Sequence, residues 1–162
     1  MPMIPRRQGG FTLIEVLIAL LVLAIGLLGM ASLTMTSLQG NQGAYLRGQA
    51  SMLAYDYVER MRGNSAQALL ATSPYVISLT PGSTRTNPDC RTKTAGCTAT
   101  ELANQDIFDW WGNLQAAIPG SSVTVTKANT NEYQVVISWT ESDAQQRSTG
   151  TQAQDFTLRV NL

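Results

Sequence analysis

The stretch FTLIEVLIALLVLAIGLLGMA, residues 11–31, decides how this chain is organised. It consists mostly of Leu, Ile, Val, Ala and Gly, and Glu15 is the only charged residue between positions 11 and 45. A helix rises about 1.5 Å per residue, so roughly 20 residues cross a hydrocarbon layer of about 30 Å. The sequence therefore predicts a transmembrane helix over residues 11–31.

Basic residues flank this span on one side only. Arg6 and Arg7 precede it, and the next Lys or Arg is Arg47. Positive charge beside a first span tends to stay in the cytoplasm. We therefore expect a single-pass protein with a cytoplasmic N-terminus and with the remaining chain outside the inner membrane.

An ordinary secretory signal peptide is the alternative for the same segment. It would be cut at the small-residue site Gly29-Met30-Ala31. The apolar region of such peptides usually has 7–15 residues, whereas this one is longer and contains Glu15. These two features favour a helix that is retained in the mature protein.

The composition excludes several classes of function. Lys plus Arg and Asp plus Glu are both 11, so the net charge is zero and no basic excess favours nucleic acid. The chain contains no histidine, which removes Ser-His-Asp catalysis, Cys-His catalysis and His-ligated zinc. Two cysteines are too few for a four-cysteine metal centre.

A membrane-anchored periplasmic enzyme would need paired carboxylates or a Ser-Lys arrangement. The acids and lysines outside the long N-terminal helix have no recognisable catalytic spacing. Those considered are Asp106, Asp109, Glu132, Glu141, Asp143, Asp155, Lys93 and Lys127. We interpret them as surface charge and expect no catalytic residue and no metal or cofactor.

Residues 8–17, QGGFTLIEVL, resemble the class III signal of type IV prepilins and their pseudopilin relatives. In that family a short basic leader ends in glycine, Phe begins the mature chain, and Glu follows four residues after the Phe. The resemblance implies that residues 1–10 are a leader and that a prepilin peptidase cleaves after Gly10. It also implies that the new amino group of Phe11 is N-methylated.

Glu15 is an acid within an apolar span. A carboxylate in a membrane costs a few kcal/mol, although a position at the start of a helix recovers up to about 1 kcal/mol from the helix dipole. The resemblance implies a further role, in which Glu15 attracts the Phe11 amine of a neighbouring subunit during filament assembly. Such a pair would neutralise the acid and set the axial register.

The same resemblance implies a location and a set of partners. The protein would reside in the inner membrane before assembly and in a pilus at the cell surface afterwards. Its partners would be the prepilin peptidase, other minor pilins, the major pilin, an inner-membrane assembly platform driven by ATP, and a tip adhesin. A minor pseudopilin of a type II secretion system is the alternative within the family.

Helical patterning continues beyond the membrane span, over residues 32–63. Apolar residues recur at spacings of four, three, four and four, and Gly63-Asn64 provides a stop signal. The stripe consists of Leu46, Ala50, Leu53, Tyr57 and Met61. A helix from Phe11 to about Arg62 would be near 78 Å long. Major pilins commonly carry a proline within this helix; since none occurs between Pro5 and Pro74, the resemblance favours a minor subunit.

The segment that follows is expected to be irregular, with one short strand at residues 74–79 stopped by Pro81-Gly82. Cys90 and Cys97 are seven positions apart in a polar loop, which suits a small disulfide in an oxidising periplasm. A redox or metal pair is the alternative, but it usually shows CxxC spacing and additional ligands.

A second helix is predicted over residues 100–117, with Thr100 as a candidate N-cap. Its apolar positions have helical spacing, and two more aromatic residues widen the stripe. The stripe is Ile107, Trp111, Leu114 and Ile118, widened by Phe108 and Trp110. Because aromatic side chains bury large areas, we expect core packing here and no ligand site.

From Pro119-Gly120 onward the period changes to two, which predicts antiparallel strands. The alternating residues fall at 123–125, 133–139 and 156–160, with a hairpin at 129–131 and a longer polar loop at 141–153. The expected fold is α+β and type IV pilin-like, with the long helix packed on a small antiparallel sheet. The periplasmic domain would span residues 64–162, as an αβ segment at 64–120 and the sheet at 121–162.

Overall fold

The computed structural model describes residues 10–142 and 151–162. The expected leader, with Arg6 and Arg7, lies outside the described residues except for Gly10. Asp143 and the centre of the expected polar loop, residues 143–150, also lie outside them. The chain divides into two compact units, residues 1–40 and residues 41–162.

The N-terminal unit contains the first part of helix α1, Leu13–Gly63. Every residue from position 10 to position 38 is exposed. Among the described residues, α1 is the one helix long and apolar enough to cross a membrane, and none of its apolar window is buried in the protein. The core helix of a soluble protein can be equally long and apolar, but it is mostly buried. A signal sequence near the N-terminus can have the same length and apolar composition as this part of α1.

The C-terminal part of α1 forms one wall of the core of the second unit. Ala50, Tyr57 and Met61 are fully buried, and Leu46 and Leu53 are partly buried against them. The predicted apolar stripe is therefore confirmed. The helix ends at Gly63, where the sequence predicts its end.

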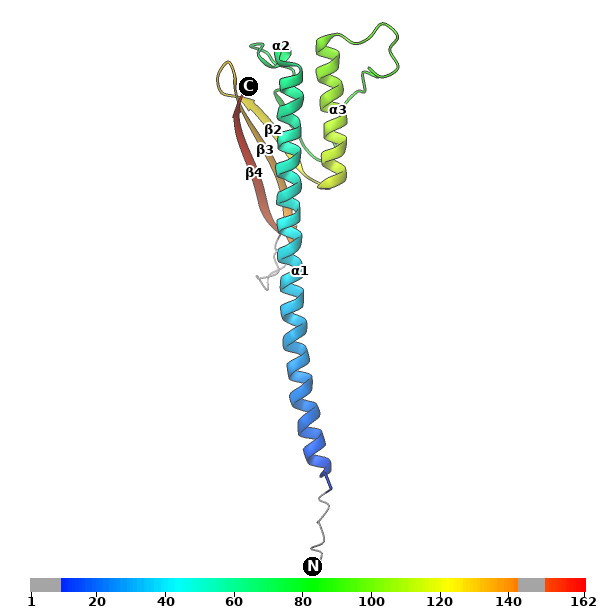
Figure 1. Ribbon diagram of the computed structural model, residues 1–162, viewed down its shortest axis with the longest axis vertical. Coiled ribbons are helices and arrows are strands. Elements are labelled where there is room, and N and C mark those ends of the chain that lie inside the picture. The colour runs from blue at the N-terminus through cyan, green and yellow to red at the C-terminus, as the bar shows by residue number, and fades with distance from the viewer. Residues whose placement is uncertain (1–9, 143–150) are drawn as a thin grey trace, which may run out of the picture. The chain divides into compact units, whose positions relative to one another are not determined.

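The sheet has four antiparallel strands in the order β1-β2-β3-β4, and Figure 1 labels the last three of them. The strands are β1 Ile77–Leu79, β2 Ser122–Lys127, β3 Glu132–Ser142 and β4 Thr151–Asn161. Alternate residues of β2 and β3 face the core, as the period of two predicts, and β1 adds a short edge strand beside β2. The α+β class expected from the sequence is confirmed.

The expected polar loop at 141–153 is wrong at both ends. Strand β3 continues through Ser142 and β4 begins at Thr151, with Glu141 paired to Gln152 and Ser142 paired to Thr151. Backbone hydrogen bonds hold this end of the hairpin together. Its side chains are polar on both faces, so no alternation of apolar and polar residues marks these positions as strand.

Helix α3, Ala99–Ala117, begins with a capping box, and the expected cap at Thr100 is wrong. Thr98 is the N-cap: its hydroxyl accepts a hydrogen bond from the N–H of Glu101 at 3.2 Å, and the Glu101 carboxylate accepts one from the N–H of Thr98 at 2.9 Å. This reciprocal pair satisfies two backbone donors that the helix itself leaves free. A short helix, α2 Ser65–Ala68, follows α1.

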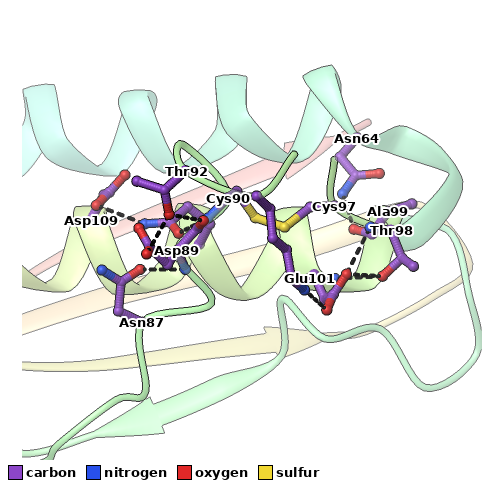
Figure 2. The surroundings of a disulfide bond; sticks show 12 residues. Asn64, Asn87, Asp89, Cys90, Thr92, Cys97, Thr98, Ala99, Glu101 and Asp109 are labelled. Carbon is purple, nitrogen blue, oxygen red and sulfur yellow. Dashed lines mark hydrogen bonds and ion pairs between the residues drawn. A yellow bond between two sulfur atoms is a disulfide. The ribbon is translucent and has the colours of Figure 1, made fainter. Parts of the chain in front are cut away.

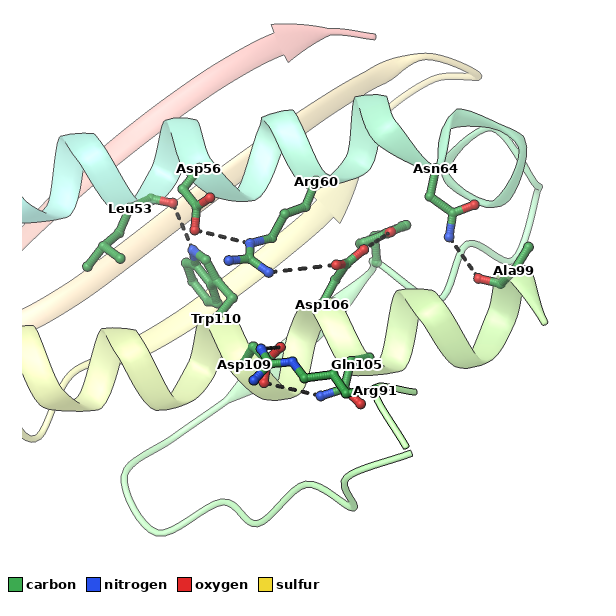
Figure 3. Close-up of polar contacts among 11 residues, drawn as sticks. Leu53, Asp56, Arg60, Asn64, Arg91, Ala99, Gln105, Asp106, Asp109 and Trp110 are labelled. Atoms are coloured by element: carbon green, nitrogen blue, oxygen red, sulfur yellow. Dashed lines mark hydrogen bonds and ion pairs between the residues drawn. The ribbon is translucent and has the colours of Figure 1, made fainter. Parts of the chain in front are cut away.

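Trp110 joins α3 to α1 in the core. Its ring lies 4.6 Å from that of Tyr57, and its indole N–H donates to the carbonyl of Leu53 at 2.8 Å (Figure 3). Trp110 is fully buried and Trp111 is 7% exposed. The expectation that the aromatic residues of this helix form core is confirmed for both tryptophans. It is wrong for Phe108, which is half-buried and does not belong to the core.

The cap of α3 gives the folded chain a dependence on pH. Hydrogen bonds from the Lys93 ammonium and from Thr98 lower the pKa of Glu101 from 4.5 to about 2. Because the pKa is lower in the folded chain, the stabilisation is complete above about pH 4.5 and is lost as the pH falls toward 2. We expect Glu101→Gln to lower the Tm of the full chain at pH 6. The difference from wild type should shrink to nothing near pH 2, measured by circular dichroism in detergent at low salt; a constant difference would contradict this account.

Candidate functional site

The predicted processing site lies at the exposed start of the described chain. Gly10 and Phe11 precede the first residue of α1, and Phe11 is 85% exposed. A Cβ added at Gly10 would meet nothing within 4 Å. The packing of this chain therefore does not require glycine at position 10, so a requirement for glycine would have to come from a processing enzyme.

Glu15 lies in the first turn of α1 and is exposed. The N–H groups of Glu15 and Val16 both donate to the Thr12 carbonyl, at 3.1 and 3.3 Å, and close this turn. An acid in the first turn interacts favourably with the positive end of the helix dipole. The side chain is thus held at a helix start close to Phe11 in sequence, where the predicted new amine would be.

The apolar face of α1 is the largest feature of the N-terminal unit. Its bulky side chains are between 50% and 80% exposed. They include Leu13, Ile14, Leu17, Leu20, Ile25, Leu28, Leu33 and Leu38. Exposed apolar patches larger than a few hundred Å² mark membrane or protein interaction sites. This surface requires lipid or other helices around it.

Two threonines near the end of the apolar stretch bond to their own helix. The hydroxyl of Thr34 donates to the Met30 carbonyl at 2.9 Å, and that of Thr36 donates to the Ser32 carbonyl at 3.1 Å. A hydroxyl bonded in this way can enter an apolar environment without an unpaired donor. These polar residues therefore do not prevent α1 from being surrounded by apolar groups beyond residue 31.

In the second unit, the predicted disulfide joins Cys90 and Cys97, with their Cα atoms 5.5 Å apart (Figure 2). The loop is tied to α3 at several points. The N–H of Cys90 donates to the Gln105 side chain at 3.1 Å, Arg91 forms an ion pair with Asp109 at 2.9 Å, and Lys93 forms one with Glu101. The disulfide loop and α3 therefore form one connected surface.

A polar network connects α1 to α3 beside Trp110 (Figure 3). The Tyr75 hydroxyl donates to Asp106 at 2.7 Å, and Arg60 lies between Asp106, at 3.6 Å, and Asp56, at 3.1 Å. The Tyr57 hydroxyl donates to the carbonyl of Tyr75 at 2.8 Å. Burial raises the pKa of Asp106, and the hydrogen bond from Tyr75 and the charge of Arg60 oppose that increase. The network fixes how the two helices pack.

Apart from Asp143, which lies outside the described residues, the acids and lysines considered for catalysis are engaged in contacts within the fold. Asp106 and Asp109 take part in the helix contacts above, and Lys93 pairs with the capping residue of α3. Lys127 donates to the carbonyls of Ala68 and Leu70 at 3.0 and 2.7 Å. Glu132, Glu141 and Asp155 bond to Asn129, Trp139 and Thr157, respectively. The sequence predicts surface charge at these positions, whereas the structure places several of them in contacts that join elements of the fold, Asp106 and Lys127 among them.

Sequence reasoning missed two of these arrangements. The capping box was readable, since Thr98 and Glu101 have the required spacing. The Ala68 carbonyl at the end of α2 accepts hydrogen bonds from both Lys127 and the Tyr133 hydroxyl. No local pattern in the sequence predicts these contacts. Residues that meet across more than fifty positions cannot be paired from spacing alone.

Fold and site together define a class of protein with an exposed apolar N-terminal helix that extends into a small disulfide-bonded α+β unit. Residues 5–31 match the model of the prokaryotic N-terminal methylation motif, and residues 32–108 match that of type IV pilin Tt1218. The two matches adjoin at residue 31, and the chain belongs to the type IV pilin family, a family of structural proteins. Among curated proteins and among solved structures, no match to the chain is found.

Membership implies processing by a prepilin peptidase and assembly with other pilins. The methylation motif and the apolar helix fit membrane anchoring and pilus assembly.

The disulfide should contribute measurably to stability. Closing a loop of this length removes roughly 2.5 kcal/mol of chain entropy from the unfolded state. We expect replacement of both Cys90 and Cys97 by Ser to lower the unfolding free energy of the full chain by about 2.5 kcal/mol, measured by urea unfolding in detergent.

Reductant supplies the control for this measurement. It should shift the wild type by the same amount and leave the double variant unchanged. A wild type that is equally stable with and without reductant would show that the loop is already held by Gln105 and the two ion pairs.

Proposed function

We propose that this protein is a minor pilin of a type IV pilus, most like the type IV pilus modification protein PilV. The observation that carries the proposal is the exposed apolar face of α1, which begins beside Phe11 and belongs to the same helix that forms the core of a folded unit. Such a helix can leave lipid only when other helices cover its apolar surface. Its function is then lateral insertion among other pilin helices.

In this role the protein primes or caps pilus assembly and so supports adhesion and twitching motility. It is held in the inner membrane with its N-terminus in the cytoplasm until the ATP-driven platform extracts it. Cleavage after Gly10 exposes the Phe11 amine, which is methylated. Glu15 then pairs with the amine of a neighbouring subunit, because an unpaired carboxylate among apolar helices is costly.

The first experiment determines the mature N-terminus. We expect mass spectrometry of the protein from membranes of a cell with its own prepilin peptidase to find a peptide that begins at N-methylated Phe11. A peptide that begins at Ser32 would identify an ordinary exported protein, and an intact Met1 would identify a plain signal-anchored protein. Either of these results would overturn the proposal.

The second experiment tests Glu15 in assembly. We expect Glu15→Val to remain in the membrane and to fall at least tenfold in sheared filaments, since loss of a buried ion pair of several kcal/mol removes the preferred register. Glu59→Val, an exposed acid later in α1, is the matched control and should assemble normally. Recovery of Glu15→Val at wild-type levels would contradict the register role. Recovery of the wild type from a secretion pseudopilus and not from pili would favour the pseudopilin alternative.

A further inference from the structure

Two hollows lie between α3 and the irregular segment of residues 83–88. Their volumes are about 450 and 430 Å³, which is within the size range of ligand sites. Thr84 and Arg85 line both of them, so the two hollows are continuous with each other. We call the two together the α3 groove. Every residue that lines the groove belongs to the second unit.

The segment that forms one side of the groove is fixed to α3. The indole N–H of Trp111 donates to the Ser83 carbonyl at 3.0 Å, and the Arg85 guanidinium donates to the Asn104 side chain at 3.2 Å. The disulfide loop that follows the segment is tied to α3 as well, through the N–H of Cys90. The α3 groove is therefore already formed before a ligand enters it, as is usual for ligand sites.

The charges that line the groove are unequally compensated. Glu101 pairs with Lys93, and Asp109 pairs with Arg91. Arg85 is half-buried and forms no ion pair among the residues that the structure describes. A half-buried charge without a counter-ion is costly, so the groove favours a ligand with a negative charge beside Arg85.

Arg85 and Asn104 also supply hydrogen-bond donors. A guanidinium has five N–H groups, and that of Arg85 donates to one acceptor, the Asn104 amide oxygen. Because this oxygen is used by Arg85, the NH2 group of Asn104 remains as a second donor, without an acceptor among the described residues. A carboxylate accepts two such hydrogen bonds at once, and its pairing with arginine is commonly bidentate.

The other end of the groove is apolar. It is lined by Phe108, which is half-buried, and by Trp111. Gly112 lines the same end, and a Cβ added there would meet nothing within 4 Å, so there is space for an apolar side chain. Asn104, Phe108 and Gly112 follow one another at intervals of four residues, which is about 6 Å along the helix.

We propose that the α3 groove binds an extended peptide segment of a partner protein, in which an acidic residue and a large apolar residue are separated by one residue. The acidic side chain pairs with Arg85 and Asn104, and the apolar side chain occupies the space beside Phe108. In an extended chain, side chains two positions apart lie on one side and are about 6.8 Å apart. This distance matches the interval between the polar and the apolar end of the groove.

The backbone of the segment favours a peptide over a free carboxylate. The N–H groups of Thr84, Arg85 and Thr86 donate to no residue that the structure describes. The carbonyl groups of an extended peptide accept from such donors, as they do when a peptide binds along an exposed strand. A free carboxylate uses neither these donors nor the apolar end of the groove.

The first test is an NMR titration of the isotope-labelled full chain in detergent micelles. The probes are the blocked peptides Ser-Glu-Thr-Leu-Ser and Ser-Leu-Thr-Glu-Ser, one for each direction of binding. We expect saturable shifts of the amide signals of Thr84, Arg85 and Thr86 with one of them, at a dissociation constant of about 1 mM or below. Replacing Glu by Gln, or Leu by Ser, in that peptide should weaken binding about tenfold.

Several results of the titration would overturn the inference. One is equal binding of the Gln or Ser peptide, and another is a set of shifts confined to α1. Equal shifts with sodium acetate or with glucuronate would identify a site for a simple anion or a sugar. Shifts that depend on the concentration of the chain alone would identify a second copy as the occupant. None of these results concerns the processing motif or the apolar face of α1, so the proposed function stands in every case.

The second test removes the charge with Arg85→Gln, which should weaken the better probe about tenfold. Arg159→Gln is the matched control, because it makes the same charge change at an exposed position of β4. It should bind the probe as the wild type does. Full-strength binding by an Arg85→Gln chain whose circular dichroism is native would contradict the role of Arg85.

The third test fills the apolar end with Gly112→Leu and does not depend on the stability of the Arg85 variant. Leucine favours a helix more than glycine does, and the site is open, so the Tm of the full chain should stay the same or rise. Binding of the probe should nevertheless fall about tenfold, because the apolar side chain of the peptide loses its space. Gly48→Leu, at an equally open glycine of α1, is the control and should keep full binding. Unchanged binding by Gly112→Leu would overturn the inference.

Discussion

The constraint on which the rest of the molecule depends is the apolar surface of α1 that the chain does not cover. Residues 11–38 bury nothing within the protein, so the free energy of that surface is determined by its surroundings, lipid before assembly and helices after it. In the second unit the same helix is covered by the protein itself, because residues 41–63 pack against the sheet and a second helix. One element thus connects a surface that requires partners to a core that is already complete.

Within the second unit, α1, α3 and the disulfide loop are held together by several contacts. Tyr57 packs against Trp110 of α3 and bonds to the segment before β1, while Arg60 links α1 to Asp106. The disulfide loop is in turn tied to α3 through Gln105 and two ion pairs. The loop, α3 and α1 are therefore joined by contacts between residues that are close in space and far apart in the sequence.

The sequence predicted what depends on local patterns. The α1 stripe through Tyr57, the strands of β2 and β3 and the disulfide pairing all follow from spacing along the chain. The ends of elements were harder: Thr98 caps α3 two residues before the expected position, and β3 and β4 pair through polar residues that show no alternation. The processing motif at Gly10 is local and readable.

The burial of α1 by strands near the end of the chain has a kinetic consequence. Ala50, Tyr57 and Met61 are covered in part by residues of β3, more than seventy positions later. Contacts of such long sequence separation form late, since a long loop must close first. During synthesis the middle of α1 therefore exposes its inward-facing stripe until the last strands have been made and have paired. In that interval the chain is vulnerable to aggregation and proteolysis.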